Sequence, residues 1–157
     1  MRIRWFSLMT FAVGGVLLFG ILGHAAMQAS KVGSGDVVAD RQRLMKLNAA
    51  SWKDIQEKAK AGNIEAVAVN AETLALNAMH IPALFPEGSL SEKSKAKPEI
   101  WQDWETFVKD ASTMQALAER LRDAATAKDA ATVQNLVKDF GRQACGSCHT
   151  PFRQPPK

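Results

Sequence analysis

Residues 98–125 have the sequence PEIWQDWETFVKDASTMQALAERLRDAA, in which apolar side chains recur in steps of four and three. Steps of that size place side chains on one face of an α-helix. Pro98 suits a helix start, because the first turn has no intrahelical use for the N–H that proline lacks. The stretch predicts a long amphipathic helix with an apolar face of Ile100, Trp104, Phe107, Ala111, Met114, Ala118, Leu121 and Ala125.

Three more segments show a helical period: residues 36–60, residues 64–80 and the segment from residue 129 onward. Short links join the first helix to the second and the third to the fourth, so these neighbours should run antiparallel. Residues 81–97 form a longer irregular connection with two prolines and a glycine. No segment alternates as a strand would. We therefore predict an all-α fold, an antiparallel four-helix bundle. Its first apolar stripe is Val38, Met45, Trp52 and Ala59.

The composition limits the classes of partner. The chain has 157 residues with 20 Lys and Arg against 16 Asp and Glu, a formal charge of +4. At this length one domain can bury a real core. Two of the basic residues lie within residues 1–25, so the remainder carries only +2, and we expect no nucleic-acid partner. Two cysteines cannot build a disulfide framework.

The N-terminal segment has the three parts of a secretory signal peptide. Arg2 and Arg4 precede an apolar run over residues 6–22, and Gly23-His24-Ala25 offers small residues at a cleavage site. We expect residues 1–25 to be a signal peptide and residues 26–157 to be the exported domain, located in the periplasm. The alternative is a retained anchor at the periplasmic face of the inner membrane, because the run lies at the short edge of the roughly 17–25 residues that span a bilayer.

Both cysteines lie in one motif, Cys145-Gly146-Ser147-Cys148-His149. The pattern Cys-x-x-Cys-His is the attachment signature of c-type haem. Two thiols add to the vinyl groups of the porphyrin while the imidazole reaches the iron, and one helical turn can present all three. The motif predicts one covalently bound haem c, with Cys145 and Cys148 as thioether positions and His149 as an iron ligand.

Other interpretations of the motif are a thioredoxin-type redox pair, a zinc site and a structural disulfide. A redox pair usually follows a strand, and zinc needs about four ligands. His80 stands beside Pro82 at a helix end, where we expect a partly exposed cap residue. No Ser/His/Asp set or second metal cluster is present, so we do not expect an enzyme.

The position of this motif, near the C-terminus on the last helix of a bundle, resembles the class II c-type cytochromes, the cytochrome c′ and cytochrome c-556 family. The resemblance covers roughly residues 37–153. It includes four further segments: Arg41-Gln42-Arg43-Leu44-Met45, Leu84-Phe85-Pro86-Glu87-Gly88-Ser89, Pro98-Glu99-Ile100-Trp101 and Phe152-Arg153.

The resemblance implies roles for two residues of the first helix. Arg41 matches an arginine that contacts a haem propionate, and Met45 matches the position on the distal side of the iron. The two are four residues apart and share a helix face. The alternatives are a surface ion pair for Arg41 and simple core packing for Met45. Pro151 departs from the family pattern and predicts that the helix ends or kinks just after His149.

Met45 distinguishes two functions within the family. If its thioether completes a six-coordinate iron, the protein is an electron carrier; this is the function the sequence favours. If the distal site is open, the five-coordinate haem binds NO or CO. The resemblance also implies transient redox partner proteins and a homodimer through the first two helices, with a membrane partner only if residues 1–25 are retained.

Overall fold

The computed structural model describes residues 33–155, and the expected signal peptide, residues 1–25, lies outside them. The elements follow one another in the order α1 (Val37–Lys60), α2 (Val67–His80), a 3-10 turn η1 (Pro82–Leu84), α3 (Glu99–Gln102), α4 (Trp104–Thr126), α5 (Ala130–Phe140), η2 (Gly141–Gly146) and α6 (Ser147–Phe152). Within the described part of the chain, the only β feature is an isolated bridge between Ala96 and Arg153.

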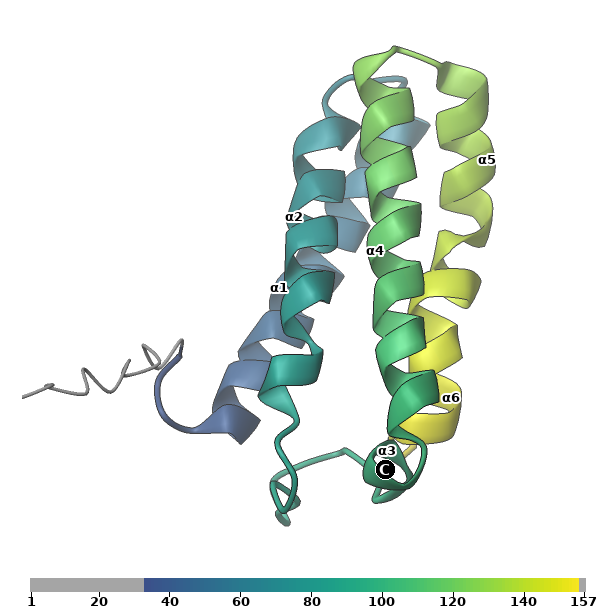
Figure 1. Cartoon of the computed structure of the whole chain (residues 1–157). Helices are drawn as coiled ribbons and strands as arrows, with labels where there is room; N and C mark the ends of the chain where they lie inside the picture. The colour runs from purple at the N-terminus through teal and green to yellow at the C-terminus, as the bar shows by residue number, and fades with distance from the viewer. Residues whose placement is uncertain (1–32, 156–157) are drawn as a thin grey trace, which may run out of the picture. The chain divides into compact units, whose positions relative to one another are not determined.

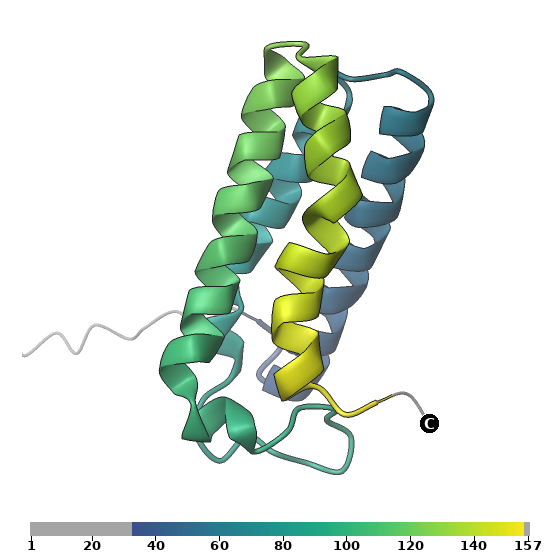
Figure 2. The ribbon, with the colours of Figure 1, turned by 90° about the vertical axis from the view of Figure 1, so that its right-hand side faces the viewer.

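These elements form an antiparallel four-helix bundle (Figures 1 and 2), as the sequence predicted. Figure 1 shows the α1–α2 and α4–α5 turns together at one end, with the long connection and α3 at the other. The fourth rod of the bundle consists of α5, η2 and α6 in succession. Consequently α1 runs antiparallel to this last rod.

The predicted third helix is interrupted. The backbone leaves the helical region at Asp103 (φ −127°, ψ 57°), which separates α3 from α4, and the Asp103 side chain then accepts a hydrogen bond from Thr106 N. An aspartate at this position satisfies an N–H that the first turn of α4 leaves free. Trp104, predicted on the apolar face, lies at the edge of the core: it is 39% exposed, and its ring packs against the buried Phe107 with centroids 5.4 Å apart.

The last rod changes its winding at the motif. α5 passes at Gly141 into η2, a π-helical stretch that contains Cys145, and α6 then carries Cys148 and His149. π-helical turns inside α-helices are rare and occur often at functional sites. Pro151 lies inside α6, and the helix ends at Phe152. The predicted stop just after His149 is therefore confirmed.

The two ends of the bundle are filled differently. The end with the two short turns, here called the packed end, has a core of small and medium side chains. The opposite end, here called the cavity end, contains larger aromatic residues around a hollow. The packed end contains Ile55, Ala59, Val67, Ala71, Ala118, Leu121, Ala125 and Val133; the cavity end contains Phe85, Ile100, Phe107, Phe140 and Phe152.

The long connection closes the cavity end by pairing with the segment that follows α6. Lys97 N donates to Phe152 O at 3.0 Å, and Gln154 N donates to Lys95 O at 2.8 Å. On the other side Trp101 Nε1 donates to Phe85 O at 3.1 Å. These bonds hold an otherwise irregular segment in one place. Among residues 33–155 no helix is both long enough and apolar enough to cross a membrane.

Candidate functional site

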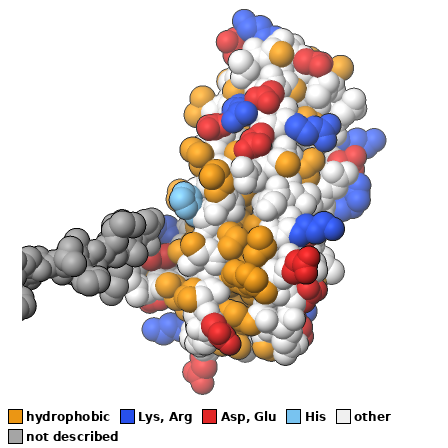
Figure 3. All heavy atoms as spheres, viewed as in Figure 1, with side chains coloured by type: hydrophobic (Ala, Val, Ile, Leu, Met, Phe, Trp, Pro, Cys, Tyr) orange, Lys and Arg blue, Asp and Glu red, His pale blue; other side chains and the backbone are white. Residues whose placement is uncertain are grey.

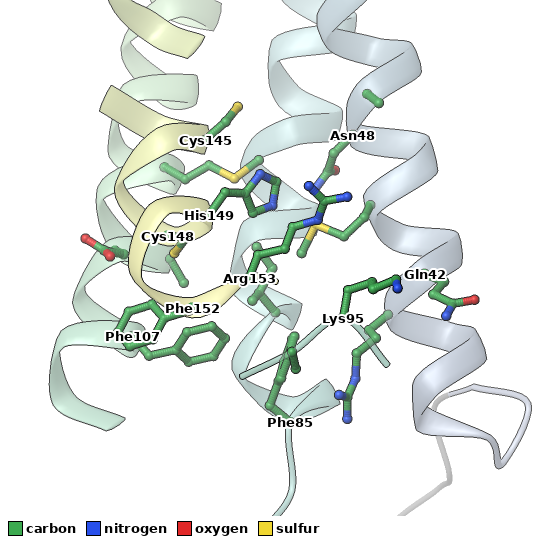
Figure 4. Close-up of a pocket in the computed structure, with 18 of the residues that line it drawn as sticks. Gln42, Asn48, Phe85, Lys95, Phe107, Cys145, Cys148, His149, Phe152 and Arg153 are labelled. Atoms are coloured by element: carbon green, nitrogen blue, oxygen red, sulfur yellow. The ribbon is translucent and has the colours of Figure 1, made fainter. Parts of the chain in front are cut away.

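A cavity of about 580 Å³ lies between α1 and the last rod at the cavity end. The motif residues Cys145, Cys148 and His149 line one wall, and α1 lines the facing wall (Figure 4). Most of the other lining side chains are apolar, and the volume falls within the range typical of pockets for small molecules and cofactors. The α1 wall includes Val38, Arg41, Gln42, Met45, Asn48 and Trp52.

The two cysteines are half-buried free thiols, which excludes a disulfide between them in this structure. Burial raises the pKa of Cys145. Burial, and then the negative charge of nearby Asp110, raise the pKa of Cys148 to about 12. Redox-active cysteine pairs have lowered pKa values, because the thiolate is the nucleophile. The burial of the two thiols and their raised pKa values therefore argue against a thioredoxin-type pair.

His149 follows Cys148 directly and lies one turn beyond Cys145 on the same wall of the cavity. Partial burial and the positive charge of Arg153 lower the pKa of His149. A lowered pKa favours the neutral imidazole, which is the form that binds a metal ion. Among residues 33–155 no three His, Cys, Asp or Glu side chains gather in a way that could hold a metal ion, as a zinc site would require.

Helix register places Met45 opposite the motif. The ring of Trp52 on α1 stacks on Phe140 at the end of α5, with centroids 4.8 Å apart. These two residues therefore lie at the same height along the antiparallel helices. Met45 comes two α-helical turns before Trp52, and α6 with His149 follows Phe140 after the six π-helical residues of η2. Met45 therefore lies level with His149 across the cavity. Iron ligation by Met45 remains a prediction.

Arg41 is not in a surface ion pair, so that alternative was wrong: its side chain is buried, with 5% exposed. The guanidinium donates to Leu84 O at 3.1 Å, to Ser94 Oγ at 3.2 Å and to Ser89 Oγ at 2.6 Å. Its carbon also lies 4.2 Å from the ring centre of Phe85. Arg41 thus ties the long connection to α1 at the edge of the cavity, and its contact with a propionate remains a prediction.

Several lining residues had no individual signal in the sequence. Asn48 follows Met45 by three residues and so shares its helix face, which could have indicated it. Ser94, Lys95 and Asp110 come from segments whose position depends on the folded chain. His80, by contrast, is exposed at the end of α2 and does not line the cavity, as expected.

Residues 36–153 match the family model described as Cytochrome C′. The chain belongs to the cytochrome c′ family. This confirms the resemblance seen in the sequence. A cytochrome c-554 from Cereibacter sphaeroides is 40% identical over 83 residues, which are 51% of this chain and 53% of that protein. The chain thus spans about half the length of this relative. A cytochrome c-556 from Agrobacterium tumefaciens is 32% identical over 63% of this chain and 79% of its own length.

Solved structures agree with the assignment to the cytochrome c′ family. Cytochrome c′ from Thermochromatium tepidum superposes with a TM-score of 0.70 at 27% identity, covering 76% of this chain and 95% of that chain. A nitric oxide complex of a mutant cytochrome c prime from Alcaligenes xylosoxidans gives a TM-score of 0.69 at 26% identity, covering 77% and 95%.

As a c-type cytochrome, this cytochrome c′ family protein binds haem c covalently, and its residues fit that group. The cavity is large and mostly apolar, with two free thiols spaced as Cys-x-x-Cys on one wall and a histidine beside them. The facing wall carries Asn48, whose buried side-chain nitrogen has no partner among the described residues. A buried polar atom left unpaired is expected to meet a bound group.

Proposed function

We propose that this protein is an exported haem protein that binds NO or CO at the distal face of one haem c. Cys145 and Cys148 are the thioether positions, and His149 is the proximal ligand. The observation that carries the proposal is the mostly apolar lining of the cavity between His149 and α1. Structural neighbours described as nitric oxide and carbon monoxide complexes of mutants of a cytochrome c prime support it.

The chain's own residues hold and enclose the group. When bound, the haem supplies an iron that coordinates a diatomic ligand or carries one electron. The imidazole of His149 can donate a nitrogen lone pair to that iron. Trp52 and Phe140, stacked at 4.8 Å, limit the entry of water at one side of the cavity. Phe107 and Phe152, edge to face at 5.5 Å, do so at another. None of this requires a substrate of its own, so we propose a binding protein, not an enzyme.

The second candidate is an electron carrier in which the Met45 thioether is the sixth ligand. The register of Met45 with His149 favours it, as do relatives named cytochrome c-554 and c-556. A filled sixth position would suit transient contacts with redox partner proteins. The sequence alone favoured this candidate, whereas the gas complexes among the structural neighbours support the first one better.

Optical spectra of the purified reduced protein separate the two candidates. The gas-binding proposal expects a high-spin spectrum and rapid, complete CO binding, with little change in Met45→Leu. A low-spin spectrum without CO binding, converted by Met45→Leu to a high-spin form that binds CO, would establish the electron carrier instead. Met114→Leu is the matched control, because Met114 is another thioether that lines the cavity, from α4.

The attachment residues have a separate test. With Cys148→Ala, the haem should lose one thioether and its absorption band in alkaline pyridine should shift, and with both cysteines changed no haem should stay on the denatured chain. Ser147→Ala, between the two thiols, should retain full attachment. Unchanged attachment in Cys148→Ala would contradict the site.

We also propose that residues 1–25 are removed and that the domain works in the periplasm. The mass of the protein recovered from the periplasmic fraction should correspond to residues 26–157 plus one haem. Recovery of the full chain in the membrane fraction would indicate the retained anchor instead.

Finally, we propose a homodimer through α1 and α2. Leu47 on α1 and Val69, Leu76 and Met79 on α2 are half or more exposed, and Figure 3 shows hydrophobic side chains along the side where α2 runs. One similar structure is described as a cytochrome c′ with ligand-controlled dimer dissociation. Sedimentation should show a dimer that Leu76→Lys converts to a monomer, whereas Leu90→Lys in the long connection should not.

A further inference from the structure

Asn48 is a buried amide in a mostly apolar wall. Its side chain lines the cavity and is 8% exposed. Its Oδ1 accepts a hydrogen bond from Asn77 Nδ2 on α2 at 2.7 Å. Its own Nδ2 is fully buried and has no partner among residues 33–155. Leaving a buried donor unpaired costs about 1–3 kcal/mol, so a partner is expected in the cavity that the residue lines.

The bond from Asn77 gives the amide a fixed orientation. With Oδ1 engaged on the α2 side, the group that Asn48 has left to offer is a donor, not an acceptor. A polar side chain held by a second residue keeps its direction without a ligand, which reduces the entropy lost when one binds. Figure 4 shows Asn48 projecting from α1 into the region between α1 and the motif helix.

The helix register shows which part of the cavity this donor serves. Asn48 lies one turn before Trp52, level with the residues one turn after Phe140, namely Ala144 and Cys145. Arg41 lies two turns away in the other direction, beside the long connection. Asn48 therefore lies one turn closer to the packed end than Met45 does. It is remote from the edge of the cavity where Arg41 binds the long connection.

We infer that the side-chain N–H of Asn48 donates a hydrogen bond to a diatomic ligand held at the distal face, with Asn77 as its positioning residue. The inference rests on the proposed NO- and CO-binding function. A donor at this point favours ligands that carry negative charge on their outer atom. It gives the pocket a means of selection that the apolar residues of the wall do not supply.

The test compares CO complexes of the reduced haem protein, prepared both in the parent and in Met45→Ala, where no thioether competes for the iron. Asn48→Leu keeps the size of the side chain and removes the donor. We expect the C–O stretching frequency to rise and NO and CO to dissociate about three- to tenfold faster, as the loss of one hydrogen bond predicts. Asn77→Ala should change both measurements in the same direction by less.

The control is Asn70→Leu. Asn70 accepts a bond from Lys58 Nζ at 2.6 Å and does not line the cavity, so its replacement should leave the C–O frequency unchanged. CO binding with an identical frequency in Asn48→Leu would overturn the inference while leaving the proposed function intact. Failure of CO to bind even with Met45→Ala would overturn both.

Discussion

The packed end and the cavity end are built from the same helices, yet one is solid and the other hollow. At the packed end, Ala71, Ala118 and Ala125 are fully buried beside Leu121 and Val133, so the helices approach closely. At the cavity end the stripe continues through larger residues that line a hollow. A heptad-like stripe therefore fixes which face turns inward, and the size of its side chains decides whether that face packs or encloses a ligand.

The largest expected stability effect lies at the packed end. Leu121→Ala removes a fully buried side chain where little can relax to fill the space. The free energy of unfolding should fall by about 2–5 kcal/mol, measured by urea denaturation, with the haem spectrum unchanged. Leu90→Ala, at a side chain 45% exposed, is the control and should change stability by about 0.5 kcal/mol or less. A shifted haem spectrum in Leu121→Ala would show that the two ends are not independent.

At the cavity end the corresponding stabilising contacts are polar: the hydrogen bonds of Arg41. Arg41→Gln removes the bonds that tie the long connection to α1, and the loss should be about 1.5–3 kcal/mol, typical of bonds to a charged donor. Proteolysis within residues 85–97 should accelerate as well. Arg43→Gln breaks the pair between the exposed Arg43 and the buried Asp40, and it should cost about 1 kcal/mol or less because Ser34 still donates to that carboxylate. Equal effects of the two variants would contradict a special role for Arg41.

The difference between the two ends also explains what the sequence could predict. The helical period predicted four helices and their inward faces, and the Cys145–His149 motif predicted the haem, because both signals are local. The break at Asp103, the π-helical winding of η2 and the bonds of Arg41 were not predicted. The bonds of Arg41 join segments far apart in the chain, whereas the cap at Asp103 and the winding of η2 are local details that the apolar period does not register. Asn48 shares a helix face with Met45, but that spacing does not reveal the bond from Asn77 that orients its amide.

Replacing Gly141, at the junction of α5 and η2, should change the free energy of unfolding less than Leu121→Ala or Arg41→Gln, and in the opposite direction. A Cβ there would lie 3.8 Å from Trp52 Nε1, an ordinary contact, and the backbone is helical. Gly141→Ala should therefore raise the free energy of unfolding by about 0.5–1 kcal/mol, seen as a higher melting temperature. Gly62→Ala, at a φ of +78°, should lower it instead. Destabilisation by Gly141→Ala would mean that η2 requires glycine for its winding.

The smallest effect concerns the start of α5. The Asp129 carboxylate accepts bonds from Thr132 N at 3.0 Å and from Thr132 Oγ1, which lower its pKa below the usual 3.8. A lowered pKa means that the stabilisation is complete above pH 3.8 and is lost as the pH falls through the lower folded value. Asp129→Ala should melt below the parent at pH 7, and the gap should close in strong acid. A gap that stays constant would contradict the capping role.

The pairing of residues 95–97 with residues 152–154 has a consequence for the order of folding. Lys97 Nζ donates to Pro151 O across 54 positions of sequence, and loops of that length lose entropy on closing that short helical contacts do not. The four helices can therefore pack together before the long connection closes the cavity end. During that interval a group as large as a porphyrin can reach the two thiols. The pairing of residues 95–97 with residues 152–154 then closes the cavity around it.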